Sequence, residues 1–175
     1  AIDNSKSIES RRRFGQFATP YELAQEIMSF GLTLQDKKEI SFLEPAFGTG
    51  AFYSALLSEC DKHAKIINTA VGVEVDKDFY VAANELWGHT NVNLVSGDFT
   101  EIEAFENINF LVSNPPYVRH HYIDKEQKSK LSAMIQKETD LSLSGLSGLY
   151  CYFILSAHKW LAPDAICGWL IPSEF

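Results

Sequence analysis

Residues 40–57 read ISFLEPAFGTGAFYSALL and contain the pattern that decides the fold. Residues 40–43 form a short apolar run typical of a buried strand, and residues 51–57 have the composition of a helix. Between them lies a turn with two glycines, Gly48 and Gly50. Glycines let a ligand approach the backbone, and a helix N-terminus offers free amides. The segment therefore predicts a strand, a turn and a helix, and its glycines either bind a nucleotide-like ligand or only make a tight turn.

Strands and helices continue to alternate along the rest of the chain. Apolar runs bounded by turn residues predict further strands over residues 70–75, 92–95, 110–112 and 165–171. Apolar spacing predicts helices over residues 78–87, 125–137 and 149–161. The predicted fold class is therefore a doubly wound α/β domain with a mostly parallel sheet that is covered on both faces. Ligands of such sheets bind at the carboxyl ends of the strands.

Local signals predict where several of these elements begin and end. Thr19, Pro20 and Glu22 predict an N-cap, a proline at the first helical position and a capping box for a helix before the first strand. Gly31 predicts the end of that helix. Pro163-Asp164 predicts a turn between the last helix and the last strand.

The composition is that of one soluble globular domain. The 175 residues are 46% hydrophobic, and 15 basic against 23 acidic residues give a formal net charge of −8. This balance excludes a globally basic nucleic-acid binder, so any contact with a polyanion has to come from a local patch. The three cysteines form no C-x-x-C pair, so we expect no disulfide framework, no metal and a reducing, cytoplasmic location. No apolar run approaches the ~18 residues of a membrane span.

Acidic residues follow two further predicted strands. Glu74 and Asp76 lie at the end of the second strand, where a carboxylate can accept both hydroxyls of a ribose. Asp98-Phe99 follows the third strand and offers an acceptor for an amino group and a ring to stack on adenine. Tyr53 stands where a dinucleotide fingerprint requires a third glycine, which disfavours NAD and FAD. Together these residues predict an adenosine pocket without phosphates, although each acid alone is typical of a solvated strand end.

The segment Ser113-Asn114-Pro115-Pro116-Tyr117 follows the fourth strand. Its two prolines fix the backbone and remove two amide donors. The Asn114 side-chain oxygen and the Pro115 carbonyl can then accept both hydrogens of an exocyclic amine, which makes the amine a better nucleophile. Tyr117 offers a stacking platform for a base swung out of its duplex. The alternative for this motif alone is an ordinary Pro-Pro turn with a core tyrosine.

Together these motifs resemble the adenine-specific DNA amino-methyltransferases of restriction-modification systems, in the group whose cofactor motif precedes the catalytic motif. The resemblance implies a Rossmann-like class I methyltransferase core, S-adenosylmethionine as cofactor, and double-stranded DNA with a flipped adenine as substrate. Residues 13–20 are similar to the leading motif, which places Thr19 near the methionine carboxylate. Residues 149–153 are similar to the helix that contributes an aromatic, here Phe153, to the cofactor pocket.

The site residues that follow from the motifs and the resemblance fall into three groups. The cofactor-binding residues are Thr19, Glu44, Pro45, Ala46, Gly48, Gly50, Glu74, Val75, Asp98, Phe99 and Phe153. The catalytic residues are Asn114, Pro115, Pro116 and Tyr117. The candidate DNA contacts are Arg11, Arg12, Arg13, Arg119 and His120, for which an ordinary solvated surface is the alternative.

One departure from the family concerns the C-terminal side. Members of the family continue with two more strands and a domain that reads the DNA sequence, whereas this sequence ends at Phe175. We therefore expect residues 1–175 to be the cofactor-binding and catalytic part, with an open fifth-strand edge that favours association with another copy or with the absent C-terminal part. Two other functions remain open: methylation of glutamine in proteins, which shares the N-P-P-Y motif, and a noncatalytic cofactor-binding module that needs a partner chain.

Overall fold

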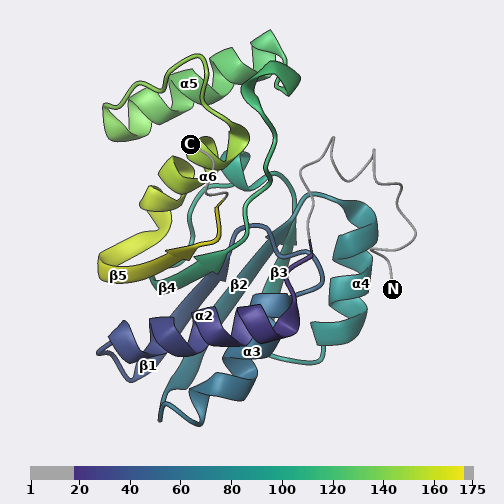
Figure 1. The fold of residues 1–175 in the computed structure, drawn as a ribbon, viewed down its shortest axis with the longest axis vertical. Coiled ribbons are helices and arrows are strands. Elements are labelled where there is room, and N and C mark those ends of the chain that lie inside the picture. Colours follow the sequence, from purple (N-terminus) through teal and green to yellow (C-terminus); the bar gives the residue numbers. More distant parts are fainter. Residues whose placement is uncertain (1–17, 172–175) are drawn as a thin grey trace.

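The computed structural model describes residues 18–171, which fold around one parallel sheet (Figure 1). Its five strands have the order β3-β2-β1-β4-β5, and every neighbouring pair is parallel. The strands are β1 (Glu39–Glu44), β2 (Ile66–Glu74), β3 (Val92–Ser96), β4 (Ile108–Ser113) and β5 (Leu161–Trp169). The predicted fold class is confirmed.

Helices cover both faces of the sheet. The α-helices are α2 (Tyr21–Leu34), α3 (Ala51–Cys60), α4 (Lys77–Trp87), α5 (Lys125–Thr139) and α6 (Leu149–Ala157). Short 3-10 turns are η2 (Phe99–Glu101), η3 (His120–Tyr122) and η4 (His158–Trp160). Residues of α2, α3 and α4 share one apolar core with one face of the sheet, and α6, η2 and η4 share a second core with the other face. Helix α5 packs on the outer side of α6 (Figure 1).

The first helix differs from its predicted ends. Helix α2 continues past Gly31 to Leu34 because this glycine faces the sheet, where an added Cβ would lie 2.9 Å from Cζ of Phe110. The glycine therefore permits close packing of helix on strand and does not terminate the helix. The predicted capping box is also wrong: the N-cap residue is Pro20, without a side-chain cap, and the Thr19 hydroxyl accepts a hydrogen bond from Asn114 instead.

The predicted turn before the last strand is a bulge inside the strand. Helix α6 ends at Ala157 and β5 begins at Leu161, so Pro163 and Asp164 belong to β5. The pairing register with β4 shifts at this point, and Asp164 has a φ of 62°. A proline is tolerated at a bulge and in an edge strand because its missing amide breaks no ladder hydrogen bond there.

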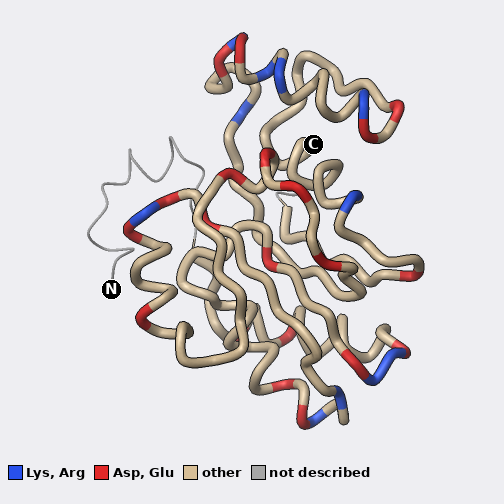
Figure 2. The backbone as a smooth tube through the Cα atoms, turned by 180° about the vertical axis from the view of Figure 1, so that it is seen from behind, with Lys and Arg blue, Asp and Glu red and all other residues tan. Residues whose placement is uncertain are grey.

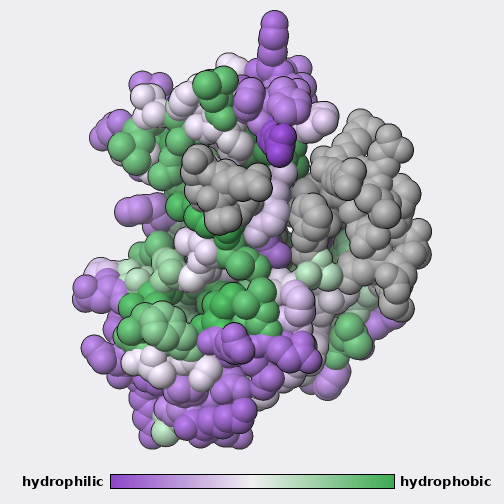
Figure 3. Space-filling model, in the orientation of Figure 1, coloured by the Kyte–Doolittle hydropathy of each residue, from purple (hydrophilic) through white to green (hydrophobic). Residues whose placement is uncertain are grey.

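Strand β5 forms one edge of the sheet. Over the described range, no strand pairs with its outer side. Figure 3 shows a hydrophobic region on the adjacent face, over α2, whose exposed apolar residues are Tyr21, Leu23, Phe30 and Leu34. An unpaired edge beside exposed apolar side chains is a template for strand pairing with another chain.

We predict that this polypeptide associates as its concentration rises, and that Cys167→Lys reduces the association. Cys167 is exposed in β5, and a lysine on an edge strand opposes pairing with a second edge. Sedimentation velocity under reducing conditions measures the effect, with Leu86→Lys on the remote helix α4 as the matched control. A mass that stays monomeric at high concentration contradicts the prediction.

Candidate functional site

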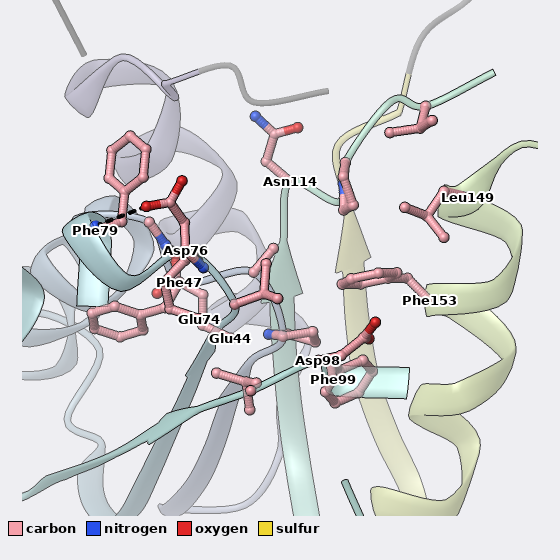
Figure 4. Close-up of a pocket in the computed structure, with 18 of the residues that line it drawn as sticks. Glu44, Phe47, Glu74, Asp76, Phe79, Asp98, Phe99, Asn114, Leu149 and Phe153 are labelled. Carbon is pink, nitrogen blue, oxygen red and sulfur yellow. Dashed lines mark hydrogen bonds between the residues drawn. The ribbon is translucent and has the colours of Figure 1, made fainter. Parts of the chain in front are cut away.

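A cavity of about 780 Å³ lies at the carboxyl ends of the strands (Figure 4). Strand β1 pairs with β2 on one side and with β4 on the other, so the cavity lies at the point where the strand order reverses, the expected place for a ligand. The structure brings most of the predicted site residues together there. The lining includes Thr19, Glu44, Pro45, Ala46, Gly48, Glu74, Val75, Asp98, Phe99, Asn114, Pro116 and Phe153.

The two glycines of the turn after β1 have different surroundings. Gly48 has a φ of 55° and lines the cavity, and an added Cβ would meet open space among the described residues. Gly50 has a φ of 82° and does not line the cavity; an added Cβ would lie 2.5 Å from Nε1 of Trp87 and 2.7 Å from Cε1 of Phe47. Gly50 is therefore required by packing at the start of α3, whereas Gly48 leaves room for a ligand.

Glu74 connects the glycine turn to the turn after β2. Its Oε2 accepts a hydrogen bond from the Gly48 amide at 2.7 Å, and its Oε1 accepts one from the Asp76 amide at 2.8 Å. A carboxylate oxygen has two lone pairs, so these bonds leave capacity for ligand hydroxyls. Asp76 caps α4 by accepting from the amides of Asp78 and Phe79 (Figure 4). Glu74 therefore links the two turns and lines the cavity with a hydrogen-bond acceptor, and Asp76 has a structural role at the rim.

Glu44 is a buried carboxyl at the end of β1. Its side chain is 2% exposed, and its Oε2 accepts a hydrogen bond from the Tyr53 amide at 3.1 Å. Burial raises the pKa of Glu44 well above its usual value, and the nearby charge of Glu74 adds to this effect.

Aromatic rings form the wall on the far side of the cavity. Asp98 caps η2 by accepting hydrogen bonds from the Thr100 amide at 2.9 Å and the Thr100 hydroxyl at 2.7 Å. The Phe99 ring lies 5.5 Å from the Phe153 ring and stacks on Trp160 at 5.9 Å, measured between centroids. Phe99 and Phe153 therefore offer an apolar surface next to a carboxylate, which suits a flat heterocycle with an amino group.

The catalytic motif lies between the large cavity and a smaller hollow. Asn114 Nδ2 donates to the Thr19 hydroxyl at 3.1 Å, and the Tyr117 hydroxyl donates to Asn114 Oδ1. The hollow, of about 390 Å³, is lined by Ala18, Thr19, Pro20, Asn114, Tyr117, Leu170 and Ile171. Asn114 and Thr19 line both spaces, Tyr117 lines only the hollow, and Pro115 lines neither.

The Tyr117 hydroxyl has two possible acceptors. It lies within hydrogen-bonding distance of Asn114 Oδ1 and 2.7 Å from the Leu170 carbonyl oxygen. A phenol carries one proton, so it donates to one of these oxygens at a time. Burial raises the pKa of Tyr117, which keeps the hydroxyl protonated as a donor. Asn114 Oδ1 can therefore accept a hydrogen bond from another donor while the phenol donates to the Leu170 carbonyl.

Two of the predicted DNA contacts, Arg119 and His120, belong to the described residues. Arg11, Arg12 and Arg13 fall outside the described residues. Arg119 is exposed and His120 half-buried just before and within η3, and neither lines the cavity or the hollow. The basic residues of the following stretch lie in α5, at one end of the molecule (Figure 2). Lys130 is paired with Glu101 at 2.6 Å, which ties α5 to η2.

Other cavity residues were missed by the sequence interpretation. Tyr122 of η3, Ile123 directly after it and Gln127 of α5 line the cavity, and Tyr122 is 67% exposed. Phe47 and Phe79 also line it. Their sequence context carries no ligand-binding pattern; only their closeness to the catalytic motif and the glycine turn hinted at a role. Between residues 18 and 171 no group of His, Cys, Asp and Glu side chains is arranged to hold a metal, and no helix is long and apolar enough to cross a membrane.

The fold and the site together define a methyltransferase-like α/β protein, and comparisons with known proteins give the family. The sequence matches the Eco57I restriction-modification methylase family over residues 21–175. The chain belongs to this family. It is 34% identical over 176 residues to the type II methyltransferase M.AccI of Acinetobacter calcoaceticus. That match covers 99% of this chain and 31% of the relative, so the chain spans about a third of the relative's length.

Solved structures share the fold. A protein described as a class I S-adenosylmethionine-dependent methyltransferase from Listeria monocytogenes superposes with a TM-score of 0.72 at 16% identity, over 98% of this chain and 50% of its own. A type I restriction-modification methyltransferase subunit from Streptococcus thermophilus superposes with a TM-score of 0.68 at 15% identity, over 89% of this chain and 34% of its own. Similarity at this level of identity establishes the shared architecture.

We predict that Gly50→Ala lowers the free energy of unfolding by about 2 kcal/mol or more, and Gly48→Ala by about 1 kcal/mol. Both positions have positive φ, but only Gly50 would also press a methyl group against Trp87 and Phe47. Urea unfolding of the two variants measures the difference. Equal losses would contradict the assignment of Gly50 to packing and Gly48 to the cavity.

Proposed function

We propose that this protein uses S-adenosylmethionine to methylate the exocyclic amino group of adenine in DNA, as part of a restriction-modification system. One observation carries the proposal: Asn114 lines both the large cavity and the smaller hollow. A group at this junction can contact a methyl donor on one side and a methyl acceptor on the other. Membership of the restriction-modification methylase family favours DNA over a protein glutamine as the acceptor.

The residues of the large cavity fit the proposed cofactor. Its volume of about 780 Å³ is within the usual range for small-ligand sites. In the proposal, Glu74 accepts the ribose hydroxyls and Asp98 accepts the adenine amino group. Val75 and Phe153 contact the faces of the adenine ring, while Phe99, which the sequence assigned to the adenine face, is only 1% exposed and packs against Phe153. Thr19 and Glu44 remain for the methionine part. When bound there, S-adenosylmethionine supplies an electrophilic methyl group on a sulfonium.

The smaller hollow is the proposed site of the flipped adenine. Tyr117 offers its ring for stacking, and Asn114 Oδ1 accepts one amine hydrogen in the hollow. Pro115 lines neither space, so the proposal that its carbonyl accepts the second hydrogen rests on the N-P-P-Y motif alone. These acceptors draw the amine lone pair out of conjugation with the ring. As the amine donates to Asn114, the Tyr117 hydroxyl donates to the Leu170 carbonyl, so no buried donor is left without a partner. After transfer, the amine proton leaves to solvent.

Contact with duplex DNA has to be local because the chain carries a formal net charge of −8. Arg119 and His120, which follow the catalytic motif, are the proposed phosphate contacts on the described surface, and Arg11, Arg12 and Arg13 are further candidates from the sequence. A partner chain or further polypeptide that pairs with the β5 edge is a proposed source of additional DNA contacts.

We predict that Asn114→Ala abolishes methyl transfer in the complete enzyme and leaves the affinity for S-adenosylmethionine nearly unchanged. Asn114 activates the acceptor amine, whereas Glu74 and Asp98 hold the donor. Calorimetric titration measures binding, and transfer of a labelled methyl group to duplex DNA measures activity. Glu74→Gln is the control for the other role, and we expect its main effect to be weaker binding of S-adenosylmethionine. A large loss of cofactor affinity in Asn114→Ala would refute this division of roles.

A second pair of variants separates the two proposed roles of Tyr117. Tyr117→Phe keeps the ring and loses the hydroxyl, so we predict about a tenfold lower kcat, which corresponds to one hydrogen bond of about 1.4 kcal/mol. Tyr117→Ala also loses the stacking surface, and we expect a further loss of about tenfold or more. Single-turnover kinetics with saturating DNA measures both steps. If Tyr117→Phe retains full activity, the hydroxyl has no role in positioning Asn114.

A further inference from the structure

Glu44 has an environment unlike that of the other acidic residues around the cavity. It is 2% exposed and lines the cavity from the end of the central strand β1, next to Glu74 at the end of β2 (Figure 4). Among residues 18–171 no lysine, arginine or histidine forms an ion pair with it. Within the part of the chain that the structure describes, this buried carboxyl has no cation beside it, which is unusual unless the group is neutral or a ligand supplies the positive charge.

The groups that face Glu44 explain why its pKa is raised. The backbone amides of Tyr53 and Phe52, at the start of α3, favour the charged form. Burial outweighs them and raises the pKa of Glu44, and the negative charge of Glu74 raises it further. The Tyr53 phenol, at the start of α3, donates a hydrogen bond to the Thr90 hydroxyl and not to the carboxyl. The remaining charged groups that line the cavity are Asp76, Lys77, Asp78 and Asp98.

We propose that Glu44 makes the cavity select the cationic methyl donor over its neutral thioether product: Glu44 is protonated in the ligand-free protein, ionises against a bound sulfonium, and takes a proton back when the ligand is the thioether. The inference rests on the proposed placement of the cofactor and is independent of the identity of the methyl acceptor. It assigns Glu44 a role in cofactor specificity and in product release.

The charge difference between the two ligands is the physical basis. S-adenosylmethionine and S-adenosylhomocysteine differ by one methyl group and one positive charge. Surface carboxylates such as Asp78 discriminate weakly because water and salt screen them. A buried carboxylate interacts more strongly with a nearby cation because the local dielectric is lower. Asp98 and Asp76 are more exposed than Glu44, and each accepts local hydrogen bonds as a cap.

The sign of the pH dependence follows from this linkage. Binding of the sulfonium favours ionised Glu44 and therefore releases a proton. As the pH rises toward the ligand-free pKa of Glu44, the affinity for S-adenosylmethionine rises by up to about tenfold per pH unit, and above that pKa it levels off. The affinity for S-adenosylhomocysteine does not rise over the same range, so the preference for the donor grows with pH.

Calorimetric titration of this 175-residue chain with each ligand tests the inference. Titrations run at several pH values, each in two buffers of different ionisation enthalpy, so the heat reports proton release directly. We expect release with S-adenosylmethionine and none with S-adenosylhomocysteine. Glu44→Gln keeps an acceptor for the Tyr53 amide and should abolish the release, lower the affinity for the donor about tenfold or more, and retain the affinity for the product. Asp78→Asn, an exposed acid on the same cavity, is the matched control and should keep the proton release.

The outcomes separate this inference from the assignment of the cofactor. If both ligands bind to the unaltered chain with no difference in proton release, the role of Glu44 is overturned and the cofactor site stands. If neither ligand binds, the cofactor site is overturned, and the role of Glu44 with it. The unaltered chain alone gives these answers, so they do not depend on how well Glu44→Gln folds. Because the raised pKa means that an ionised Glu44 destabilises the ligand-free fold, that variant should be at least as stable as the unaltered chain at neutral pH.

Discussion

The parallel pairing of β1 with both β2 and β4 is the constraint on which the site depends. Parallel strands bring their carboxyl ends to one edge of the sheet, and the chain departs from β1 in opposite directions on its two sides. Glu44, Glu74 and Asn114 are far apart in sequence, yet each stands at or just after the end of one of these three strands. No loop has to be long or unusual for them to meet, because the sheet itself sets their spacing.

Hydrogen bonds between the strand ends then organise this edge. Glu74 holds the glycine turn by accepting a hydrogen bond from the Gly48 amide. The Glu44 carboxyl accepts one from the Tyr53 amide at the first turn of α3. On the other side, Thr19 at the start of α2 bonds to Asn114 after β4, which links the entry of the chain to the catalytic motif. Within residues 18–171, the carboxyl groups of Glu44 and Glu74 thus accept hydrogen bonds from backbone amides. Among the described residues that line the cavity, acidic side chains outnumber basic ones, which suits a ligand with a positive centre.

Sequence patterns sufficed where the decisive interactions are local. The strand, the glycine turn and the helix around Gly48 follow from adjacent residues, and the N-P-P-Y motif together with the acids at the strand ends indicated one crevice. The wrong predictions came from tertiary contacts. Gly31 is typical of a helix end, but it lies against Phe110 on β4. Thr19 is typical of an N-cap, but its hydrogen-bond partner Asn114 is 95 residues away in the sequence. Pro163 indicated a turn, but an edge strand tolerates it in a bulge. Tyr122 and Gln127 line the cavity because η3 and α5 pass beside it. No periodicity in the sequence indicates where these two elements lie.

The central claim is that the carboxyl ends of β1, β2 and β4 and the turn after β3 form one cofactor cavity that meets a second, base-sized hollow at Asn114. A crystal structure of the chain grown with S-adenosylhomocysteine tests this most directly. The account predicts the ribose at Glu74, the adenine between Val75 and Phe153, and the sulfur facing Asn114. A ligand bound outside this crevice, or a ligand in the crevice with its sulfur turned away from Asn114, would contradict the claim.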